Sequence, residues 1–240
     1  MKILEYTKKS RNLQEGGSSG EEGVIDEILK RIGINSEWIC EFGAIDGKKL
    51  CNTFQLVKKG FRAVYIEPVE SKFIQLQKTA KEYPNIIPIR KSVDYKIGFP
   101  DRLDNILKET PIPKDFDVLV IDTDFYDYQI WEEFKMYNPK LVIIEANQNI
   151  EGEYIHQAAH PNRMTYGDGS SFLAILELGQ RKGYTYLGHL SSNTFWIRND
   201  LAPKLGDLLL PDEELKAQII NHSNIKKFIG PRGEIKKTFK

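Results

Sequence analysis

Apolar residues along the chain recur at helical spacing in some segments and form short strand-like runs in others. The alternation of the two patterns predicts an α/β fold. Val24, Ile25, Ile28, Leu29 and Ile32 recur at helical spacing, and Gly33 ends that helix. A short apolar run, "WICEF", follows and predicts a strand. Strands are predicted at 37–42, 62–68, 85–93, 116–124, 139–147, 184–190 and 193–200, and helices at 21–33, 52–60, 70–83, 99–110, 127–137 and 170–183.

The order of these elements predicts a doubly wound, mostly parallel sheet of seven strands that closes with an antiparallel C-terminal hairpin. "DVLVI" and "LVIIE" are continuous apolar runs, typical of parallel strands that are buried on both faces. Pro88 interrupts the third strand and places it nearer an edge of the sheet. Ser191 and Ser192 separate the last two strands, which is a hairpin signal.

The chain divides into three parts by composition. Residues 1–20 are polar, include "GGSSG" and predict a flexible N-terminal arm. Residues 21–200 carry the alternating pattern and predict one domain. Residues 201–240 predict a C-terminal tail, helical at first and basic at its end. Within the domain, about twenty polar residues at 148–169 form a loop of a length that is usually functional or disordered.

Charge and cysteine content narrow the class of protein. Lys plus Arg number 34 and Asp plus Glu number 34, so the formal net charge is zero. This balance argues against a protein that holds nucleic acid by bulk electrostatics. The two cysteines, Cys40 and Cys51, form no disulfide framework and suit a reducing compartment. The N-terminus lacks the apolar run of a signal peptide, and no stretch is apolar enough to cross a membrane. We therefore expect a soluble cytoplasmic protein without a membrane partner, and the sequence leaves its oligomeric state open.

The stretch "CEFGAIDG" lies where the first predicted strand ends. In an open α/β sheet, ligands bind at the carboxyl ends of the strands. Gly43 and Gly47 allow a tight turn and a close approach of the backbone to a ligand. The motif is neither GxGxxG nor a Walker loop, and its acids, Glu41 and Asp46, would repel a pyrophosphate. Glu67 ends the second strand, where an acid can bind both hydroxyls of a ribose. An acidic glycine turn followed by such an acid fits S-adenosylmethionine (SAM), whose sulfonium and amino groups are cationic, better than a dinucleotide.

Several segments together resemble class I SAM-dependent methyltransferases. "CEFGAIDG", "AVYIEP", "DVLVIDTD" and "LVIIEAN" are similar to the successive strand-end motifs of that class. More narrowly, the chain resembles the FkbM-like group, which is associated with polysaccharide and natural-product modification. This resemblance rests on "GEEGVIDEILKRIG", "EFGAIDGKKLCNTFQLVKKGFRAVYIEP", "IDTDFYDYQIWE", "VIIEANQNI" and the closing "SSFLAILELGQRKGYTYLG…NTFWIR", and it spans residues 20–198.

The resemblance implies a Rossmann-like methyltransferase fold and a set of cofactor contacts. It implies that Glu67 holds the ribose and that Pro68 lies beside the adenine. Ser92 and Val93, after the third strand, would approach the adenine from its other side. The residues implied at the methionine part are Glu41, Gly43, Ala44 and Gly47. Asp46 is either a further contact or a cap of the following helix.

Acidic and amide side chains follow the fourth and fifth strands. Asp122 and Glu145 are the strongest candidates for catalysis, and Asp122 would also face the cofactor. Asp127 is expected to cap or open the helix that carries Trp131. A carboxylate after the fourth strand, with a carboxylate and an amide after the fifth, resembles the magnesium site of catechol-type and some sugar O-methyltransferases. Asp122, Glu145 and Asn147 are therefore candidate Mg²⁺ ligands, although Glu-x-Asn departs from the adjacent Asp-Asn pair of that pattern.

Two histidines in the long loop, His156 and His160, are candidate general bases. Imidazole titrates near neutrality and can take a proton from a hydroxyl or an amine. His189 lies in a predicted strand and His222 in the tail, and both are interpreted as incidental. The loop would close over a sugar or a phosphorylated substrate.

The sequence therefore predicts a SAM-dependent methyltransferase that acts on a small-molecule acceptor. The family resemblance supplies the acceptor class, a sugar or polysaccharide precursor methylated on oxygen. One alternative is an N-methyltransferase that acts on a small amine, and another is a non-catalytic SAM-binding module. A nicotinamide-dependent dehydrogenase is disfavoured because the glycines that cradle phosphates are missing.

Overall fold

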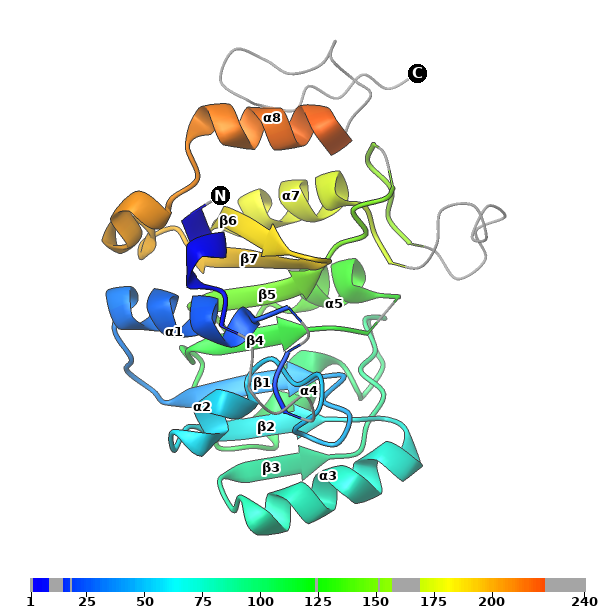
Figure 1. Cartoon of the computed structure of the whole chain (residues 1–240). Coiled ribbons are helices and arrows are strands. Elements are labelled where there is room, and N and C mark those ends of the chain that lie inside the picture. Colours follow the sequence, from blue (N-terminus) through cyan, green and yellow to red (C-terminus); the bar gives the residue numbers. More distant parts are fainter. Residues whose placement is uncertain are drawn as a thin grey trace.

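The computed structural model describes residues 2–8, 15–17, 19–123, 125–150, 152–156 and 169–222. Seven strands form one sheet in the order β3-β2-β1-β4-β5-β7-β6 (Figure 1). The first five strands, β1 to β5, are parallel to one another, and β7 runs antiparallel between β5 and β6. The bounds of the strands are β1 Trp38–Phe42, β2 Arg62–Ile66, β3 Ile86–Ile89, β4 Val118–Ile121, β5 Leu141–Glu145, β6 Tyr184–Leu190 and β7 Asn193–Arg198.

This sheet confirms the predicted fold class, a doubly wound, mostly parallel seven-stranded sheet with an antiparallel C-terminal hairpin. β3 is an edge strand, as Pro88 predicts, and Ser191 and Ser192 join β6 and β7 in a hairpin. The α-helices are α1 Glu21–Ile32, α2 Phe54–Lys58, α3 Glu70–Glu82, α4 Leu103–Lys108, α5 Asp127–Glu133, α7 Phe172–Arg181 and α8 Asp212–His222, with 3-10 helices η1 Lys2–Tyr6 and η2 Ala202–Leu208. None of the helices in these described ranges has the length and hydrophobicity needed to cross a bilayer.

Helices cover both faces of the sheet and enclose two apolar clusters. On one face, α1, α2 and α3 pack against strand residues such as Ile39 and Val120. On the other face, α4, α5 and α7 pack against residues such as Phe42 and Leu119. The strands contribute alternate residues to the two clusters because successive side chains point to opposite faces. Removing this apolar surface from water is the main force that holds the three layers together.

The N-terminal segment departs from the prediction of an arm separate from the domain. Ile3 in η1 is fully buried and belongs to the cluster under α1. Tyr6 accepts a hydrogen bond from Arg31 Nη2 at 3.0 Å. Apolar burial and this contact fix η1 to the domain. The C-terminal segment is helical in its described part, where Leu205 of η2 and Ile219 of α8 are buried against the domain. The basic end at 223–240 lies outside the described residues.

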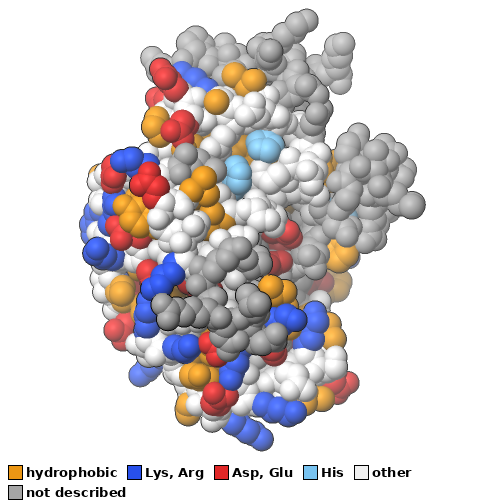
Figure 2. Space-filling model, viewed as in Figure 1, with side chains coloured by type: hydrophobic (Ala, Val, Ile, Leu, Met, Phe, Trp, Pro, Cys, Tyr) orange, Lys and Arg blue, Asp and Glu red, His pale blue; other side chains and the backbone are white. Residues whose placement is uncertain are grey.

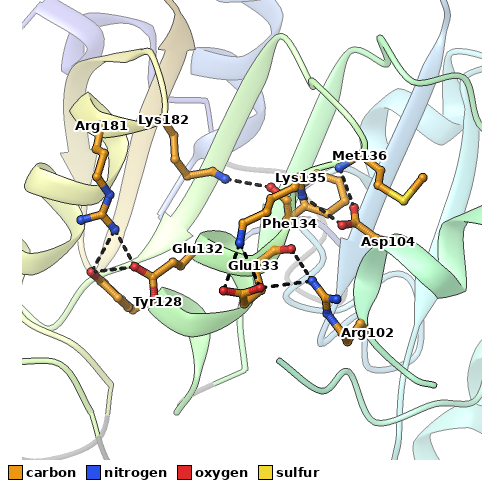
Figure 3. Close-up of polar contacts among 10 residues, drawn as sticks. All are labelled: Arg102, Asp104, Tyr128, Glu132, Glu133, Phe134, Lys135, Met136, Arg181 and Lys182. Carbon is orange, nitrogen blue, oxygen red and sulfur yellow. Dashed lines mark hydrogen bonds and ion pairs between the residues drawn. The ribbon is translucent and has the colours of Figure 1, made fainter. Parts of the chain in front are cut away.

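A polar network fastens the end of α5 to its neighbours (Figure 3). Arg102 donates to the backbone oxygen of Glu133 at 2.9 Å, and Lys182 Nζ donates to the backbone oxygen of Phe134 at 2.8 Å. The carboxylate of Asp104 accepts the backbone N–H groups of Lys135 and Met136, at 3.0 and 3.1 Å. These bonds satisfy backbone groups at and just beyond the carboxyl end of α5. They hold α5 in place, so the start of α5 has a fixed position at the carboxyl edge of the sheet.

Candidate functional site

A cavity of about 340 Å³ opens at the carboxyl ends of β1, β2 and β4, and we call it the β1–β2 cavity. Its volume lies in the range of small-molecule sites. The residues that line it come from four separate segments of the chain, and they are Phe42, Gly43, Ile66, Glu67, Pro68, Val69, Lys72, Lys91, Ser92, Val93, Asp122, Thr123, Phe125, Tyr126 and Ile130.

Gly43 allows the turn after β1 to pass directly over the end of β4. Its φ is 79°, a left-handed conformation that favours glycine. A Cβ atom at this position would lie 2.1 Å from the backbone oxygen of Asp122. The Gly43 N–H donates instead to the backbone oxygen of Ile66 at 3.1 Å, which joins the turn to β2. The glycine therefore brings the ends of β1, β2 and β4 together at one wall of the cavity.

Glu67 is buried, with 2% of its surface exposed, and it lines the cavity. Its Oε1 accepts the backbone N–H of Val69 at 2.8 Å, and its Oε2 accepts that of Ile45 at 3.1 Å. A carboxylate oxygen has two lone pairs, so each oxygen keeps capacity for one more donor. The two N–H groups fix the carboxylate in an orientation that suits a pair of adjacent hydroxyls, such as those of a ribose.

Six of the predicted cofactor residues line this cavity, and four do not. Those on its wall are Gly43, Glu67, Pro68, Ser92, Val93 and Asp122. Together they provide two carboxylates, a hydroxyl and apolar surface, which fits a ligand that carries a ribose, a base and a positive charge. The SAM molecule that the sequence predicts is a ligand of this type. The other four, which are absent from the cavity wall in the described structure, are Glu41, Ala44, Asp46 and Gly47.

The carboxylate of Glu41 binds the chain itself. Its oxygens accept the backbone N–H groups of Asn52 at 2.8 Å and Thr53 at 3.0 Å, the Thr53 hydroxyl at 2.6 Å and the Cys51 thiol at 3.2 Å. Burial raises the pKa of Glu41, and these donors offset only part of that rise. Glu41 therefore holds the segment that leads into α2, and its oxygens face away from the β1–β2 cavity.

The turn between β1 and α2 is also stabilised by three further residues of the predicted cofactor set, Ala44, Asp46 and Gly47. Asp46 Oδ1 accepts the N–H groups of Lys48 at 2.9 Å and Lys49 at 2.7 Å, so it caps the turn before α2. The Ala44 N–H donates to the backbone oxygen of Ile66 at 3.3 Å. Gly47 has a φ of 78°, and a Cβ there would lie 2.7 Å from Leu76 of α3.

The structure adds residues to the cavity that the sequence analysis did not single out. Phe125 and Tyr126 supply aromatic surface, and the sequence signal was the pair of aromatic residues inside "DTDFYD". Lys72 and Lys91 bring positive charge to the rim, and no motif marked either of them. Lys91 pairs with Asp101 at 3.1 Å and with Glu109 at 3.4 Å.

A second cavity, of about 490 Å³, lies at the same edge of the sheet beyond β5, and we call it the β5–β6 cavity. The residues that line it are Glu145, Asn147, Gln148, Asn149, His189, Ser191 and Ser192. All of them are polar, and they offer carboxylate, amide, imidazole and hydroxyl groups. The sequence analysis placed Glu145 and Asn147 at a site, but it interpreted His189 as incidental.

Asp122 and Glu145 mark the boundary between the two cavities. Ile121 pairs with Ile144 in the parallel register, so Asp122 and Glu145 are each one residue beyond a paired position on adjacent strands. The sequence analysis placed both acids at one edge of the sheet, and the pairing confirms it. Asp122 lines the β1–β2 cavity, whereas Glu145 lines the β5–β6 cavity. The two cavities are therefore neighbours across the ends of β4 and β5.

The candidate magnesium ligands do not form a set in one cavity. Asp122 lines one cavity, and Glu145 and Asn147 line the other. The Asn147 side-chain oxygen accepts the backbone N–H of Asn149 at 2.9 Å. Among the residues that the structure describes, no three His, Cys, Asp or Glu side chains gather closely enough to hold a metal ion. The Mg²⁺ site therefore stays a prediction from the sequence.

Asp127 is a buried acid beneath the boundary of the cavities. It is the first residue of α5, and 1% of its surface is exposed. Its Oδ1 accepts the N–H of Thr123 at 2.8 Å and the Thr123 hydroxyl at 3.0 Å. Its Oδ2 has no hydrogen-bond partner among the described residues. Burial, together with the nearby charge of Glu145, raises the pKa of Asp127 to about 7. As predicted, Asp127 opens the helix, and it also orders the turn that follows Asp122.

His156 lies behind the aromatic wall of the β1–β2 cavity. Its ring centroid is 5.6 Å from that of Phe125 and 5.5 Å from that of Tyr126, and 1% of its surface is exposed. Its backbone N–H donates to Ser170 Oγ at 3.1 Å. It lines neither cavity in the described structure. His160 lies outside the described residues, so its role as a base stays a prediction.

No family model matches the chain, and no curated protein matches it. Solved structures of similar fold include a SAM-dependent methyltransferase from Aquifex aeolicus, with 14% identity and a TM-score of 0.43, covering 82% of this chain and 95% of that one. Magnesium protoporphyrin IX methyltransferase from Synechocystis PCC 6803, solved with bound SAM, has 12% identity and a TM-score of 0.44, covering 74% and 77%.

A third similar structure is the N-terminal domain of EvdMO1, solved with bound S-adenosylhomocysteine (SAH). It has 11% identity and a TM-score of 0.43, and the match covers 75% of this chain and 79% of that one. At these identities the likeness concerns the fold alone. Membership of the FkbM-like group stays a prediction from the sequence.

Proposed function

We propose that the protein is a SAM-dependent methyltransferase that methylates a hydroxyl group of a small polar acceptor, such as a sugar or a polysaccharide precursor. One observation carries the proposal. Three features line the β1–β2 cavity together: the tight turn at Gly43, the buried carboxylate of Glu67, which suits a ribose, and the carboxylate of Asp122. These are the groups that a nucleoside with a cationic tail requires, and no phosphate-binding loop accompanies them.

Different residues around the β1–β2 cavity would contact different parts of the methyl donor. Glu67 would accept the two ribose hydroxyls on its free lone pairs. Pro68, Val69 and Val93 offer apolar surface to a flat base, and Ser92 adds a hydroxyl. Asp122, at the side nearest the second cavity, would attract the positive end of the donor. When bound, SAM supplies a methyl group on a positively charged sulfur.

The β5–β6 cavity is the proposed acceptor site. Its wall offers amide groups from Asn147, Gln148 and Asn149 and hydroxyl groups from Ser191 and Ser192. Neutral donors and acceptors of this kind suit a molecule with many hydroxyl groups. No lysine or arginine lines this cavity in the described structure, which favours an uncharged acceptor over a phosphorylated one. Asp122 and Glu145 each follow a paired residue of adjacent strands, so a hydroxyl held in the β5–β6 cavity would lie near the positive end of a donor held in the β1–β2 cavity. Such proximity is a large part of what methyl transfer needs.

The test has a binding step and a transfer step. Isothermal titration calorimetry with SAM, SAH and NAD should show binding of the first two and none of NAD. Transfer of labelled methyl from SAM is then measured with a panel of simple sugars and methyl glycosides and with a matched panel of amino sugars. Failure to bind SAM at millimolar concentration would overturn the proposal. Labelling confined to the amines would replace it with N-methylation, and binding without any transfer would leave a SAM-binding module.

A further inference from the structure

His189 stands on the wall of the β5–β6 cavity, and its ring is held from behind. The Tyr186 hydroxyl lies 2.7 Å from His189 Nδ1. In the part of the chain that the structure describes, Nε2 has no hydrogen-bond partner, and the side chain lines the cavity. Histidine side chains are visible on this face of the molecule, in its upper half where β6 and α7 lie (Figure 2).

A β-bulge brings His189 to the same face of the sheet as Tyr186. The pairing of β6 with β7 shifts register between Tyr186 and Gly188. Before the shift, Tyr186 belongs to the apolar cluster under α7, and Leu187 belongs to the opposite cluster. After the shift, Leu190 belongs to the same cluster as Leu187, so His189 lies on the face of Tyr186. In a regular strand, residues three apart point to opposite faces. The bulge, a feature that commonly re-aims a side chain, therefore makes this contact.

The hydrogen bonds around Tyr186 select one tautomer of His189. The Tyr186 hydroxyl donates its single proton to Gln218 Oε1 of α8 at 2.9 Å. The same oxygen can then only accept from His189, so Nδ1 carries the imidazole proton. Nε2 consequently holds a lone pair. The ring therefore presents a proton acceptor on the side that Tyr186 does not occupy.

The surroundings of His189 favour the neutral ring. Burial lowers the pKa of His189, and the neighbouring His222, with ring centroids 6.4 Å apart, lowers it further. The other titratable side chain in contact with it is Tyr186 from its own strand, and Glu145 lines the same cavity. At neutral pH the imidazole is thus available as a base.

We propose that His189 is the general base of the methyl transfer, with Nε2 taking the proton of the acceptor hydroxyl in the β5–β6 cavity. This inference rests on the proposed function and assigns the base to His189 in place of His156 or His160. In the step, a new bond forms between the acceptor oxygen and the methyl carbon, and the bond between that carbon and sulfur breaks. Sulfur keeps the electron pair and becomes neutral, and the hydroxyl proton moves to Nε2. Tyr186 and Gln218 are positioning residues because they act through the tautomer of His189.

The first test measures the tautomer directly and needs no acceptor. The chain has four histidines, so the ¹⁵N spectrum of histidine-labelled protein is simple, and His189→Gln assigns the resonance of His189. We expect the Nδ1–H tautomer and a pKa below the ordinary value of histidine. An Nε2–H tautomer at His189 would overturn the proposal.

Two variants test the positioning residues as a matched pair. Tyr186→Phe removes the acceptor for the Nδ1 proton, so the His189 spectrum should move toward the Nε2–H form that free imidazole favours. Gln218→Glu offers only acceptor oxygens, so Tyr186 must still donate to it and the Nδ1–H form should persist. If the tautomer is the same in Tyr186→Phe as in the unaltered protein, Tyr186 does not position His189. If Gln218→Glu instead switches the tautomer, the hydrogen bonds do not run from His189 Nδ1 through the Tyr186 hydroxyl to Gln218 as proposed.

Turnover with the best acceptor from the sugar panel completes the test. Loss of a general base typically costs about 10²–10⁴-fold, so His189→Ala should lose turnover on that scale while SAM affinity stays unchanged in calorimetry. Added imidazole should restore part of the activity, with a pH dependence set by imidazole itself. Thr185→Ala serves as the control, because Thr185 lies on the same strand and its hydroxyl contacts Asn199 at the surface, outside the cavity. Full activity of His189→Ala would overturn this proposal alone, whereas loss of SAM binding by the unaltered protein would overturn the proposed function.

Discussion

The backbone N–H of Ile45 donates a hydrogen bond to Glu67 Oε2 at 3.1 Å, across 22 residues of sequence. Ile45 has a φ of 52°, which is a genuine outlier for a β-branched residue. Strain of this kind persists where surrounding contacts over-determine it, and it is common at ligand sites. The carboxylate of Glu67 supplies one such contact while its other side faces the β1–β2 cavity. One side chain thus fixes the turn after β1 and forms the proposed ribose contact.

Replacement of Glu67 by alanine should weaken SAM binding by about 1–3 kcal/mol, the usual cost of losing a hydrogen-bonded charged group. That cost corresponds to a rise of roughly 5- to 150-fold in the dissociation constant. Calorimetry measures it directly. Glu70→Ala is the matched control, since Glu70 is exposed and pairs with Arg90 on the surface. Equal losses in both variants would remove Glu67 from the site.

Asp122→Asn should reduce turnover far more than it reduces SAM affinity. The carboxylate lines the side of the β1–β2 cavity nearest Glu145, where the positive sulfur would lie, whereas Glu67 and its neighbours hold the nucleoside. Single-turnover assays under saturating SAM separate the two effects. An Asp122→Asn enzyme with full turnover would contradict the assignment.

Gly43→Ala should destabilise the protein more than Gly60→Ala does. Both glycines have left-handed φ values, 79° and 101°, so alanine is strained at either position. A Cβ at Gly60 meets nothing within 4 Å, whereas one at Gly43 lies 2.1 Å from the Asp122 backbone oxygen. We expect about 1 kcal/mol from the strain alone at Gly60 and a larger loss at Gly43. Urea unfolding compares the two, and equal losses would mean that the close approach of β1 to β4 does not occur.

The stability of the protein should depend on pH through Asp127. Burial raises its pKa from an ordinary value of 3.8 to about 7 in the folded state. Between these values the folded protein holds a proton that the unfolded chain has released. The free energy of unfolding therefore falls as the pH rises from about 4 to 7. Asp127→Asn keeps an acceptor for Thr123 and carries no charge. The variant should therefore gain stability relative to the unaltered protein between pH 5 and pH 8.

The measurement is urea unfolding at several pH values. Burial also raises the pKa of Glu22 to about 7, so Glu22→Gln should show the same trend. A difference between Asp127→Asn and the unaltered protein that does not change with pH would show that Asp127 titrates normally.

The sequence predicts the sheet and one half of the site for a simple physical reason. Strands buried on both faces leave continuous apolar runs, and parallel topology then places the residues after β1, β2 and β4 at one edge. Glu67 and Asp122 could be assigned from these rules alone. Glu41 could not, because its alternation with Cys40 and Phe42 turns its carboxylate toward the start of α2.

The other half of the site depends on features that a hydrophobic pattern does not contain. Likewise, Ile3 joins the core from a segment too short to show a period, so the sequence pattern did not mark it as a core residue. His189 was interpreted as incidental because it lies in a predicted strand, and a regular strand would place it on the face opposite Tyr186. Only the paired register of β6 and β7 reveals the contact between the two rings.

The extra residue in β6 also affects how homologous sequences should be compared. A homologue that kept all residues from Tyr186 to His189 but paired β6 without the bulge would lose the contact, because the imidazole would turn to the other face. A homologue with one residue fewer there would keep both rings on one face of a regular strand. An alignment that slides by one position there would match histidines with different partners. The pairing register of β6, rather than the residue at one aligned position, would then mark where relatives keep or lose this chemistry.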